Sequence, residues 1–585
     1  MTLQTIDWII IIAFLALIVG VGVSFTNKAS GSLANYFLGG RNLSWWVAGT
    51  SMVATTFAAD TPLAVTELVA KNGIAGNWLW WNMLLGGMLT TFFFARLWRR
   101  AGILTDLEFI EMRYHGKPAA FLRGFRSVYM GIFMNSLIIG WVNVALMSII
   151  EVFFGVPKSE QIMYVGLAMV LVVTYSSLSG LLGVAITDVI QFVIAMTGCI
   201  ILAYLVVNST EIGGIVGLKE KLPEWSLSYF PKIGDAASAT DVAGTLTLSI
   251  GAFLAFTTMQ WWASWYPGAE PGGGGYIAQR MMSAKNEKHA IYATLFFQVA
   301  HYCIRPWPWI LVALCAVVLY PELSADDKKL GYVMAMKDFL PPGLKGLLLV
   351  AFFAAYMSTI STQLNWGASY LINDLYHRFI NPQAENKQLV LASRIVTLVL
   401  MLLSLWVTTL ITSISAVWTF IIECGAGLGL VLILRWYWWR INAWSEIVAT
   451  IAPFVGYAFS KYVLGWEFPN SFFLTVGFTT LAWLVATFVT RPTSLQRLQH
   501  FYQKVQPEGA WRPVRESLEL EKPRTKVPVL FATWLCAILM TYSTLFLLGD
   551  LIFQNYLSFT SWLAVALLSG FLLVRLANRI QIFED

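Results

Sequence analysis

The chain has 585 residues, of which 58% are hydrophobic and only 12% are charged. Because soluble proteins carry about 25% charged residues, this composition excludes an ordinary water-soluble enzyme. The net charge of +6 is spread along the chain without a basic patch, so we expect no nucleic-acid partner. The five cysteines show no CxxC spacing and no HExxH sequence occurs, so we expect neither a disulfide framework nor a metal centre.

Apolar segments recur along almost the whole chain and predict an all-α integral membrane protein. About fifteen of them are long enough to cross a bilayer as helices, and their continuous apolar character favours helices over a β-barrel. Their approximate limits are 6–26, 44–70, 76–98, 124–154, 160–180, 182–207, 243–267, 288–320, 343–377, 388–412, 413–440, 442–465, 469–490, 527–550 and 556–577.

The basic residues predict the orientation of these spans. If the N-terminus lies outside, most Lys and Arg fall in loops on the inner side, as the positive-inside rule requires. We therefore expect a multi-pass protein of the plasma membrane, in a bacterium the inner membrane, with a cytoplasmic C-terminus. The basic segment 491–526 is predicted to be a cytoplasmic linker that either lies on anionic lipid heads or only sets the topology.

The predicted span 44–70 is interrupted by polar residues and a proline. The sequence from Phe57 to Pro62 predicts a break, with Pro62 as the first residue of a new helical half and Asp60 or Thr61 as its cap. Transporters use such broken helices to offer carbonyl oxygens to ions and helix N-termini to substrates. A proline kink with local threonine hydrogen bonds is the alternative.

A glycine-rich stretch, PGAEPGGGGY, occupies positions 267–276. No GK[ST] follows it, so a nucleotide site is not expected. We interpret it as a flexible inner turn after the span 243–267.

The predicted span 343–377 carries a polar face. Ala355, Ser358 and Thr359 lie at i, i+3 and i+4, on one side of a helix. Small and hydroxyl-bearing residues allow close helix packing, but neighbouring hydroxyls are also hard oxygen ligands of the kind a small cation needs. The residues alone leave both interpretations open.

Four charged residues lie well inside predicted spans, where a charge costs about 2.5–3.5 kcal/mol, whereas Glu67 and Asp374 lie nearer span ends. The four are Asp60, Asp188, Arg305 and Glu423. Asp188 is expected to face water or a cation, or to bond nearby hydroxyls. Arg305 keeps its charge and needs an anionic partner. We expect an internal pair with Asp60 or Glu423 rather than a bound anionic substrate, because an unpaired buried arginine would be unstable whenever substrate left.

Four stretches together resemble the sodium:solute symporter family, the relatives of sodium/glucose and sodium/proline symporters. They are YFLGGRNLSWWVAGTSMVATTF, YSSLSGLLGVAITDVIQ, YIAQRMMSAKNEKHA and AAYMSTISTQLNWGASYLINDLY. The resemblance covers roughly residues 5–490 and implies a LeuT-type core of two inverted five-helix repeats with extra terminal helices. The implied units are an N-terminal span and loop (1–43), the first repeat (44–207), the second repeat (208–440), two further spans (441–490), the basic linker (491–526) and a C-terminal pair of spans (527–585).

The resemblance also implies a sodium site. Residue by residue, it carries over to the carbonyl groups of Ala54, Phe57 and Ala355 and to the hydroxyls of Ser358 and Thr359. Asp188 matches the acidic residue near the family's inward sodium exit. The implied candidates for substrate binding are Thr56, Asp60, Thr61, Trp261, Trp262, Tyr302, Arg305 and Glu423.

The function implied by the resemblance is sodium-coupled import of a small polar solute, such as a sugar, an amino acid or a carboxylate, by alternating access. We expect sodium as the co-transported ion, no organic cofactor, no enzymatic activity, the lipid bilayer as surroundings, and a monomer or weak homo-oligomer. A proton-coupled symporter, with Asp60 or Asp188 as the titrating group, is the closest alternative. A transporter-like sensor is disfavoured because the linker 491–526 is too short for a signalling domain.

Overall fold

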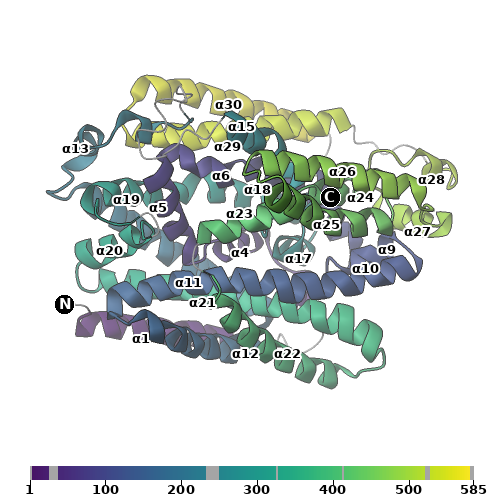
Figure 1. The fold of residues 1–585 in the computed structure, drawn as a ribbon, viewed down its shortest axis with the longest axis horizontal. Coiled ribbons are helices and arrows are strands. Elements are labelled where there is room, and N and C mark those ends of the chain that lie inside the picture. Colours follow the sequence, from purple (N-terminus) through teal and green to yellow (C-terminus); the bar gives the residue numbers. More distant parts are fainter. Residues whose placement is uncertain are drawn as a thin grey trace.

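The computed structural model describes residues 3–24, 37–231, 250–324, 327–411, 414–520 and 527–579. In these ranges the regular structure is entirely helical, apart from two isolated β-bridges. Most of the long helices run along the longest axis of the molecule (Figure 1). Parts of the predicted loop before residue 37, the start of the predicted span 243–267 and the end of the linker lie outside the described residues.

The helices follow one another closely, and several are joined through short π-helical or 3₁₀ segments. The first part of the chain holds α1 (Thr5–Ser24), η1 (Gly39–Arg41), α4 (Trp45–Thr55), α5 (Asp60–Asn72), η2 (Ile74–Asn77), α6 (Trp78–Trp81), α7 (Met83–Leu89), η3 (Thr90–Phe94), α8 (Ala95–Ala101), α9 (Glu108–Arg113), α10 (Gly116–Val128), η4 (Tyr129–Met134), α11 (Asn135–Phe154) and α12 (Lys158–Val207). The middle part holds α13 (Gly214–Lys221), η5 (Glu224–Leu227), α15 (Ile250–Leu254), η6 (Ala255–Gln260), α16 (Trp261–Ala263), α17 (Gly275–Ser283), α18 (Glu287–Val299), η7 (Ala300–Ile304), α19 (Pro306–Leu319), α20 (Leu330–Phe339), α21 (Leu344–Ser369), η8 (Tyr370–Ile380), α22 (Asn386–Thr408), α23 (Ile414–Cys424) and α24 (Leu428–Tyr437). The last part holds α25 (Ala443–Ala458), η9 (Phe459–Val463), α26 (Asn470–Val489), α27 (Leu495–Val505), α28 (Arg512–Glu516), α29 (Val527–Ile552) and α30 (Tyr556–Arg579).

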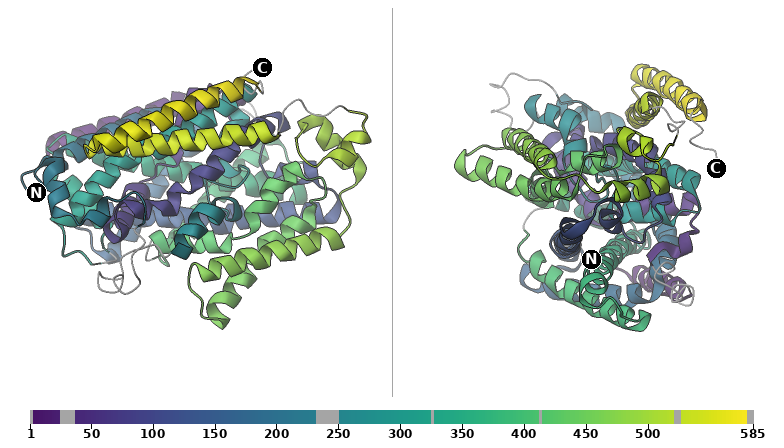
Figure 2. Two further views of the ribbon diagram at one scale, coloured as in Figure 1. Left: turned by 90° about the horizontal axis from the view of Figure 1, so that it is seen from above. Right: turned by 90° about the vertical axis from the view of Figure 1, so that its right-hand side faces the viewer.

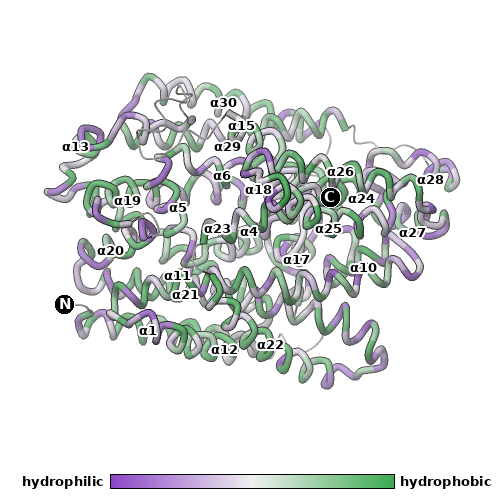
Figure 3. Tube along the Cα trace, in the orientation of Figure 1, coloured by the Kyte–Doolittle hydropathy of each residue, from purple (hydrophilic) through white to green (hydrophobic). Residues whose placement is uncertain are grey.

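Within the described ranges, eight helices are long and apolar enough to cross a membrane, or nine if a pair bent by 51° counts as one span. The bent pair is formed by α23 and α24. Apolar residues dominate the long helices, and polar residues gather mainly at their ends and in the short helices (Figure 3). Several other predicted spans are interrupted helices, so they do not qualify as single long segments. The multi-pass membrane architecture is therefore present, and the number of about fifteen spans stays a prediction.

Helix α12 covers two predicted spans, 160–180 and 182–207. Its 50 residues would extend about 75 Å at 1.5 Å per residue, more than twice the apolar thickness of a bilayer. The two parts have different neighbours: Met169 contacts Asn143 of α11, whereas Asp188 bonds residues of α4 and α21. The number of membrane crossings made by α12 stays a prediction.

The predicted break in span 44–70 is confirmed. Helix α4 ends at Thr55 and α5 begins at Asp60, with four non-helical residues between them. The predicted cap is wrong in detail, because the residue before α5 is Ala59 and no side chain caps its N-terminus. Pro62 is the third residue of the new half and not the first.

The glycine-rich stretch is not a flexible turn, which corrects the prediction. Residues 264–274 form a break between α16 and α17, and most of them are buried. Glycine is required here: Gly273 has a φ of +78°, and a Cβ on it would come within 2.8 Å of the Trp98 indole nitrogen. That nitrogen donates a hydrogen bond to the carbonyl of Gly272 at 2.8 Å. The interrupted helix that begins with α15 therefore continues through α17 to residue 283, past the end predicted at residue 267.

The segment 491–526 is folded onto the helical core over its described part, residues 491–520, and its role as a cytoplasmic linker stays a prediction. Helices α27 and α28 lie against α8, α9 and the end of α24. Trp511 is fully buried, and its indole donates to the carbonyl of Trp436 at 2.8 Å. Glu508 forms a buried ion pair with Arg96 of α8. The Arg113 guanidinium lies 4.7 Å from the Trp511 ring.

Replacing Trp511 with alanine is expected to destabilise the protein by about 3–5 kcal/mol, because the change empties a fully packed site. Thermal unfolding of the purified protein measures this as a lower Tm. Trp466 is the matched control, since its side chain is 43% exposed and its replacement should change Tm little. Equal shifts for the two variants would contradict the docked position of Trp511.

The C-terminal pair of helices covers one side of the bundle. Figure 2 shows α29 and α30 lying side by side along its exterior. Hydrogen bonds anchor α29 to the core. Trp534 donates to Leu85 O (2.9 Å), Tyr542 donates to Trp81 O (2.8 Å), and Trp307 of the core donates to Leu545 O of α29 (3.1 Å). Most of α30 is exposed, as expected for a helix that faces lipid.

Candidate functional site

A cavity of about 90 Å³ lies where the two helix breaks face each other. Its volume is enough for several water molecules or a small solute. The walls come from both breaks and from α4, α5, α6, α7, α11, α17, α18, η7, α21 and α23. The lining residues are Thr55, Thr56, Ala58, Asp60, Thr61, Val65, Trp80, Met83, Ile138, Trp141, Val142, Tyr266, Pro267, Gly268, Ala269, Tyr276, Phe297, His301, Tyr302, Arg305, Thr359, Gln363 and Trp418.

Arg305 binds the C-terminal end of α4. Its guanidinium donates to Val53 O at 2.9 Å, to Thr56 Oγ1 at 2.8 Å and to Thr56 O at 3.1 Å. The same group lies 5.0 Å from the Trp309 ring. The last carbonyl groups of a helix lack intrahelical partners and carry partial negative charge, so a fully buried cation is stabilised there without a carboxylate.

The expected ion pair of Arg305 is therefore wrong. Among the described residues, no ion pair within 4 Å joins Arg305 to Asp60 or to Glu423. Glu423 lies outside the cavity wall and accepts a hydrogen bond from Ser471 at 3.0 Å. Side-chain patterns cannot reveal this arrangement, because the partners of Arg305 are mainly backbone carbonyl groups.

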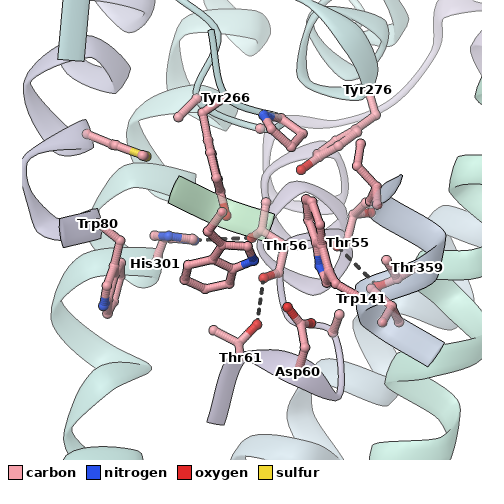
Figure 4. A pocket seen from close by; sticks show the side chains of 18 of the residues that line it. Thr55, Thr56, Asp60, Thr61, Trp80, Trp141, Tyr266, Tyr276, His301 and Thr359 are labelled. Carbon is pink, nitrogen blue, oxygen red and sulfur yellow. Dashed lines mark hydrogen bonds between the residues drawn. The ribbon is translucent and has the colours of Figure 1, made fainter. Parts of the chain in front are cut away.

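Asp60 occupies the opposite end of the same break. It is the first residue of α5 and is buried. The N-terminus of a helix carries partial positive charge, which favours a carboxylate at this position. Figure 4 shows Asp60 next to Trp141 and Thr61, with the Thr61 hydroxyl hydrogen-bonded to the carbonyl of Thr56 at 3.4 Å. The two charged side chains therefore stabilise the two ends of the interrupted helix.

Thr56 connects the break to η7. Its hydroxyl oxygen, which accepts from Arg305, also lies 3.1 Å from Nδ1 of His301. The imidazole packs edge-on against Trp80 and next to Tyr302. His301 thus faces the cavity (Figure 4).

The hydroxyl face of α21 meets the end of α4. Thr359 Oγ1 donates to Thr55 O at 3.3 Å, a contact drawn in Figure 4. Ser358 donates to one oxygen of Asp188, and Ser51 of α4 donates to the other at 2.7 Å. Ala54 is the residue before Thr55, and its carbonyl accepts from the N–H of Phe57 at 3.0 Å. The predicted sodium ligands on α4 and α21 are therefore neighbours.

Asp188 is fully buried and bonded to hydroxyl groups. Arg280 of α17 lies in the same network, donating to Thr55 Oγ1 at 3.2 Å and to Ser51 Oγ at 3.4 Å. The hydroxyl alternative for Asp188 is thus present in the structure. The network joins α4, α12, α17 and α21 next to the break between α4 and α5.

Three of the predicted substrate residues lie elsewhere: Trp261, Trp262 and, as described above, Glu423. Trp261 and Trp262 do not line the cavity, and the Trp261 ring packs 5.7 Å from Trp534 of α29. Tyr266 and Tyr276, which flank the glycine-rich break, line the cavity instead (Figure 4). Neither tyrosine is among the residues predicted from the sequence, although the glycines and prolines between them interrupt an otherwise apolar span and mark the place of the second break.

Comparisons with known proteins agree with this geometry. The profile of the sodium:solute symporter family matches residues 36–452. The sodium/glucose cotransporter of Vibrio parahaemolyticus is 26% identical over 524 residues, covering 84% of this chain and 91% of that protein. Sodium/glucose cotransporter 2 of Rattus norvegicus is 23% identical and covers 72% of this chain and 63% of that protein.

A solved structure extends the comparison to the fold. The substrate-bound, outward-open structure of a sodium-coupled sialic acid symporter is similar with a TM-score of 0.64 at 19% identity, over 84% of this chain and 99% of that chain. The protein thus has a LeuT-type helical fold, and the family match includes both helix breaks and the cavity between them. The chain therefore belongs to the sodium:solute symporter family, whose members are secondary transporters and not enzymes.

Proposed function

We propose that the protein imports one small, uncharged polar solute together with sodium by alternating access. The observation that carries this proposal is the contact between the end of α4 and the hydroxyl face of α21, directly beside a polar cavity. Sodium would bind the carbonyl oxygens of Ala54, Phe57 and Ala355 and the hydroxyls of Ser358 and Thr359. Hydroxyl and carbonyl oxygens are hard ligands suited to such an ion.

Coupling would follow from the position of this site. An ion held by both α4 and α21 stabilises the form in which these helices lie together, so sodium binding favours one of two states. In this proposal residues 44–207 and 208–440 are the inverted repeats, and the helices around the two breaks rock against the remainder. Sodium would leave inward past Asp188.

The charge distribution in the cavity supports an uncharged solute. Arg305 is compensated by the C-terminal carbonyls of α4, and Asp60 lies at the N-terminus of α5. Neither group therefore requires an oppositely charged ligand. The remaining wall offers indole, phenol, imidazole and hydroxyl groups. The aromatic side chains among them can hydrogen-bond a solute with their polar tips and contact its apolar parts with their ring faces.

The proposal also includes the location, the orientation and the oligomeric state of the protein. The protein would lie in a bacterial inner membrane with its N-terminus outside and its C-terminus in the cytoplasm, as a monomer or weak homo-oligomer. The folded segment α27–α28 would then cover the cytoplasmic end of the bundle. Residues 441–490 and 527–585 would be additions outside the two repeats.

A stability screen tests the proposal. Sodium at a hundred times its Kd should stabilise the folded protein by about 2.7 kcal/mol, which raises Tm by several degrees relative to choline. A further rise with one solute class, seen only in sodium, would identify the substrate class. A shift on acidification without any sodium effect would instead favour a proton-coupled symporter with Asp60 or Asp188 as the titrating group.

A further inference from the structure

His301 is a polar side chain in the wall of the cavity. It belongs to η7, a π-helical segment of the kind that often occurs at functional sites. Arg305 follows four residues later and lines the same cavity. The imidazole is partly exposed, and the surface it offers is part of the cavity wall (Figure 4).

Three aromatic rings fix the orientation of this imidazole. The ring centroids of Trp80 and Phe297 lie 5.5 Å and 5.2 Å from that of His301, and the ring of Tyr302 lies 4.5 Å away. All three pack edge-on against it. Packing from several sides holds a side chain in one rotamer, which is how binding residues are kept in a productive geometry.

The Thr56 hydroxyl determines which imidazole nitrogen carries the proton. Thr56 Oγ1 has one proton, which it donates to the carbonyl of Val53 at 2.9 Å or of Met52 at 3.0 Å. One of its lone pairs accepts from Arg305 at 2.8 Å. The other lone pair faces Nδ1 of His301 at 3.1 Å. Nδ1 is therefore the donor in this contact and carries the proton.

The imidazole is neutral, and its Nε2 atom is an acceptor. A second positive charge is unfavourable beside Arg305, whose guanidinium binds the same hydroxyl. A neutral imidazole with its proton on Nδ1 has a lone pair on Nε2. Among the described residues, the side-chain hydrogen bond of His301 is formed by Nδ1 and none reaches Nε2. An acceptor left unpaired in such a site is unfavourable.

We propose that Nε2 of His301 accepts a hydrogen bond from the transported solute. This inference rests on the proposed function, because it names the chemistry of the solute in the same cavity. The solute then carries an O–H or N–H group, since a solute without one leaves Nε2 unpaired. A site that hydrogen-bonds one group of its substrate strongly rejects analogues that lack this group. His301 is thus a specificity-determining residue.

Solid-state NMR of the full chain in lipid bilayers, with ¹³C- and ¹⁵N-labelled histidine, tests the proton position without any solute. The signal that disappears in His301→Gln belongs to His301, and it should report a proton on Nδ1. His289 is the internal reference. Its Nδ1 accepts from the N–H of Trp45 at 3.0 Å, so its own proton lies on Nε2. A proton on Nε2 of His301 would overturn the proposal.

Three substitutions separate the roles of the two nitrogens. Glutamine places a polar group near the position of Nε2, asparagine places one near that of Nδ1, and phenylalanine keeps only the ring. His301→Phe and His301→Asn are expected to weaken solute binding about tenfold to a hundredfold, and His301→Gln should weaken it less. Retained binding in His301→Asn together with loss in His301→Gln would show that only the Thr56 contact matters, and would refute the proposal.

His289→Asn and His289→Gln are the matched controls. His289 also forms one hydrogen bond through Nδ1, but it does not line the cavity. Both changes should leave solute binding unaltered. A loss as large as that in His301→Asn would show that removing any histidine of this region disturbs the site indirectly.

The probes are D-glucose, uridine and glycerol, which carry O–H groups, and glycine betaine, which has neither O–H nor N–H. Binding is measured as the concentration of each probe that gives half of its rise in Tm in sodium chloride. A rise with glycine betaine alone would contradict the proposal. The rise in Tm from choline to sodium should persist in every His301 variant, which shows that the variants are folded. Its absence from the unmodified protein would count against the proposed function, whereas the NMR result bears on His301 independently.

Discussion

Replacing Thr359 or Ser358 with alanine is expected to raise the sodium concentration for half-maximal uptake by about tenfold to a hundredfold. Each change removes one oxygen ligand, and an interaction between a polar group and a charge contributes about 1.5–3 kcal/mol. Every 1.4 kcal/mol is a factor of ten in affinity. The measurement is solute uptake into proteoliposomes as a function of external sodium, at constant membrane potential.

The two alanine variants should differ from each other. Ser358 also donates to Asp188, so its loss removes one of the two hydroxyl groups that this carboxylate binds. Ser358→Ala should therefore lower Tm as well as sodium affinity, whereas Thr359→Ala should act mainly on affinity. Thr359→Ser is the matched control, because it keeps the hydroxyl. Unaltered sodium dependence in both alanine variants would rule out the site.

Arg305→Met is expected to abolish transport and to destabilise the protein by about 3–5 kcal/mol. The change removes the hydrogen bonds that Arg305 donates to Val53 O, Thr56 Oγ1 and Thr56 O at the end of α4, and a hydrogen bond from a charged group contributes about 1.5–3 kcal/mol. Tm and uptake measure the two effects. Arg305→Lys should restore part of the stability, because an ammonium group donates hydrogen bonds without the planar fork of arginine.

Arg99→Met is the matched control for Arg305→Met. Arg99 also donates to backbone carbonyls, those of Ala284 and Lys285, but it is partly exposed, so water can replace the lost donors. The double variant Asp60→Arg/Arg305→Asp exchanges the two charges. It should recover neither the transport nor the stability that each single variant loses. The exchange places each charge at the helix end of its own sign. Rescue would show that the two residues form a direct ion pair.

The sequence by itself determined the features that depend on local chemistry. Proline and polar residues at 60–62 cannot continue an apolar helix without cost, and the structure interrupts the helix just before them, at residues 56–59. The i, i+3, i+4 spacing of Ala355, Ser358 and Thr359 likewise places them on one face in any helix. The four family stretches lie within or beside these same elements, so the fold class and family could be predicted together.

The tertiary structure decided what depends on distant neighbours. PGAEPGGGGY has the composition of an exposed turn, and only the packing of Trp98 against its glycines shows that it is buried. The partners of Arg305 are backbone carbonyls 249 and 252 positions away, which no side-chain pattern encodes. Trp141 and Trp418 look like ordinary membrane aromatics until the two breaks bring a cavity between them. Local patterns specify which backbone groups are left unpaired, but the fold determines which side chains reach them.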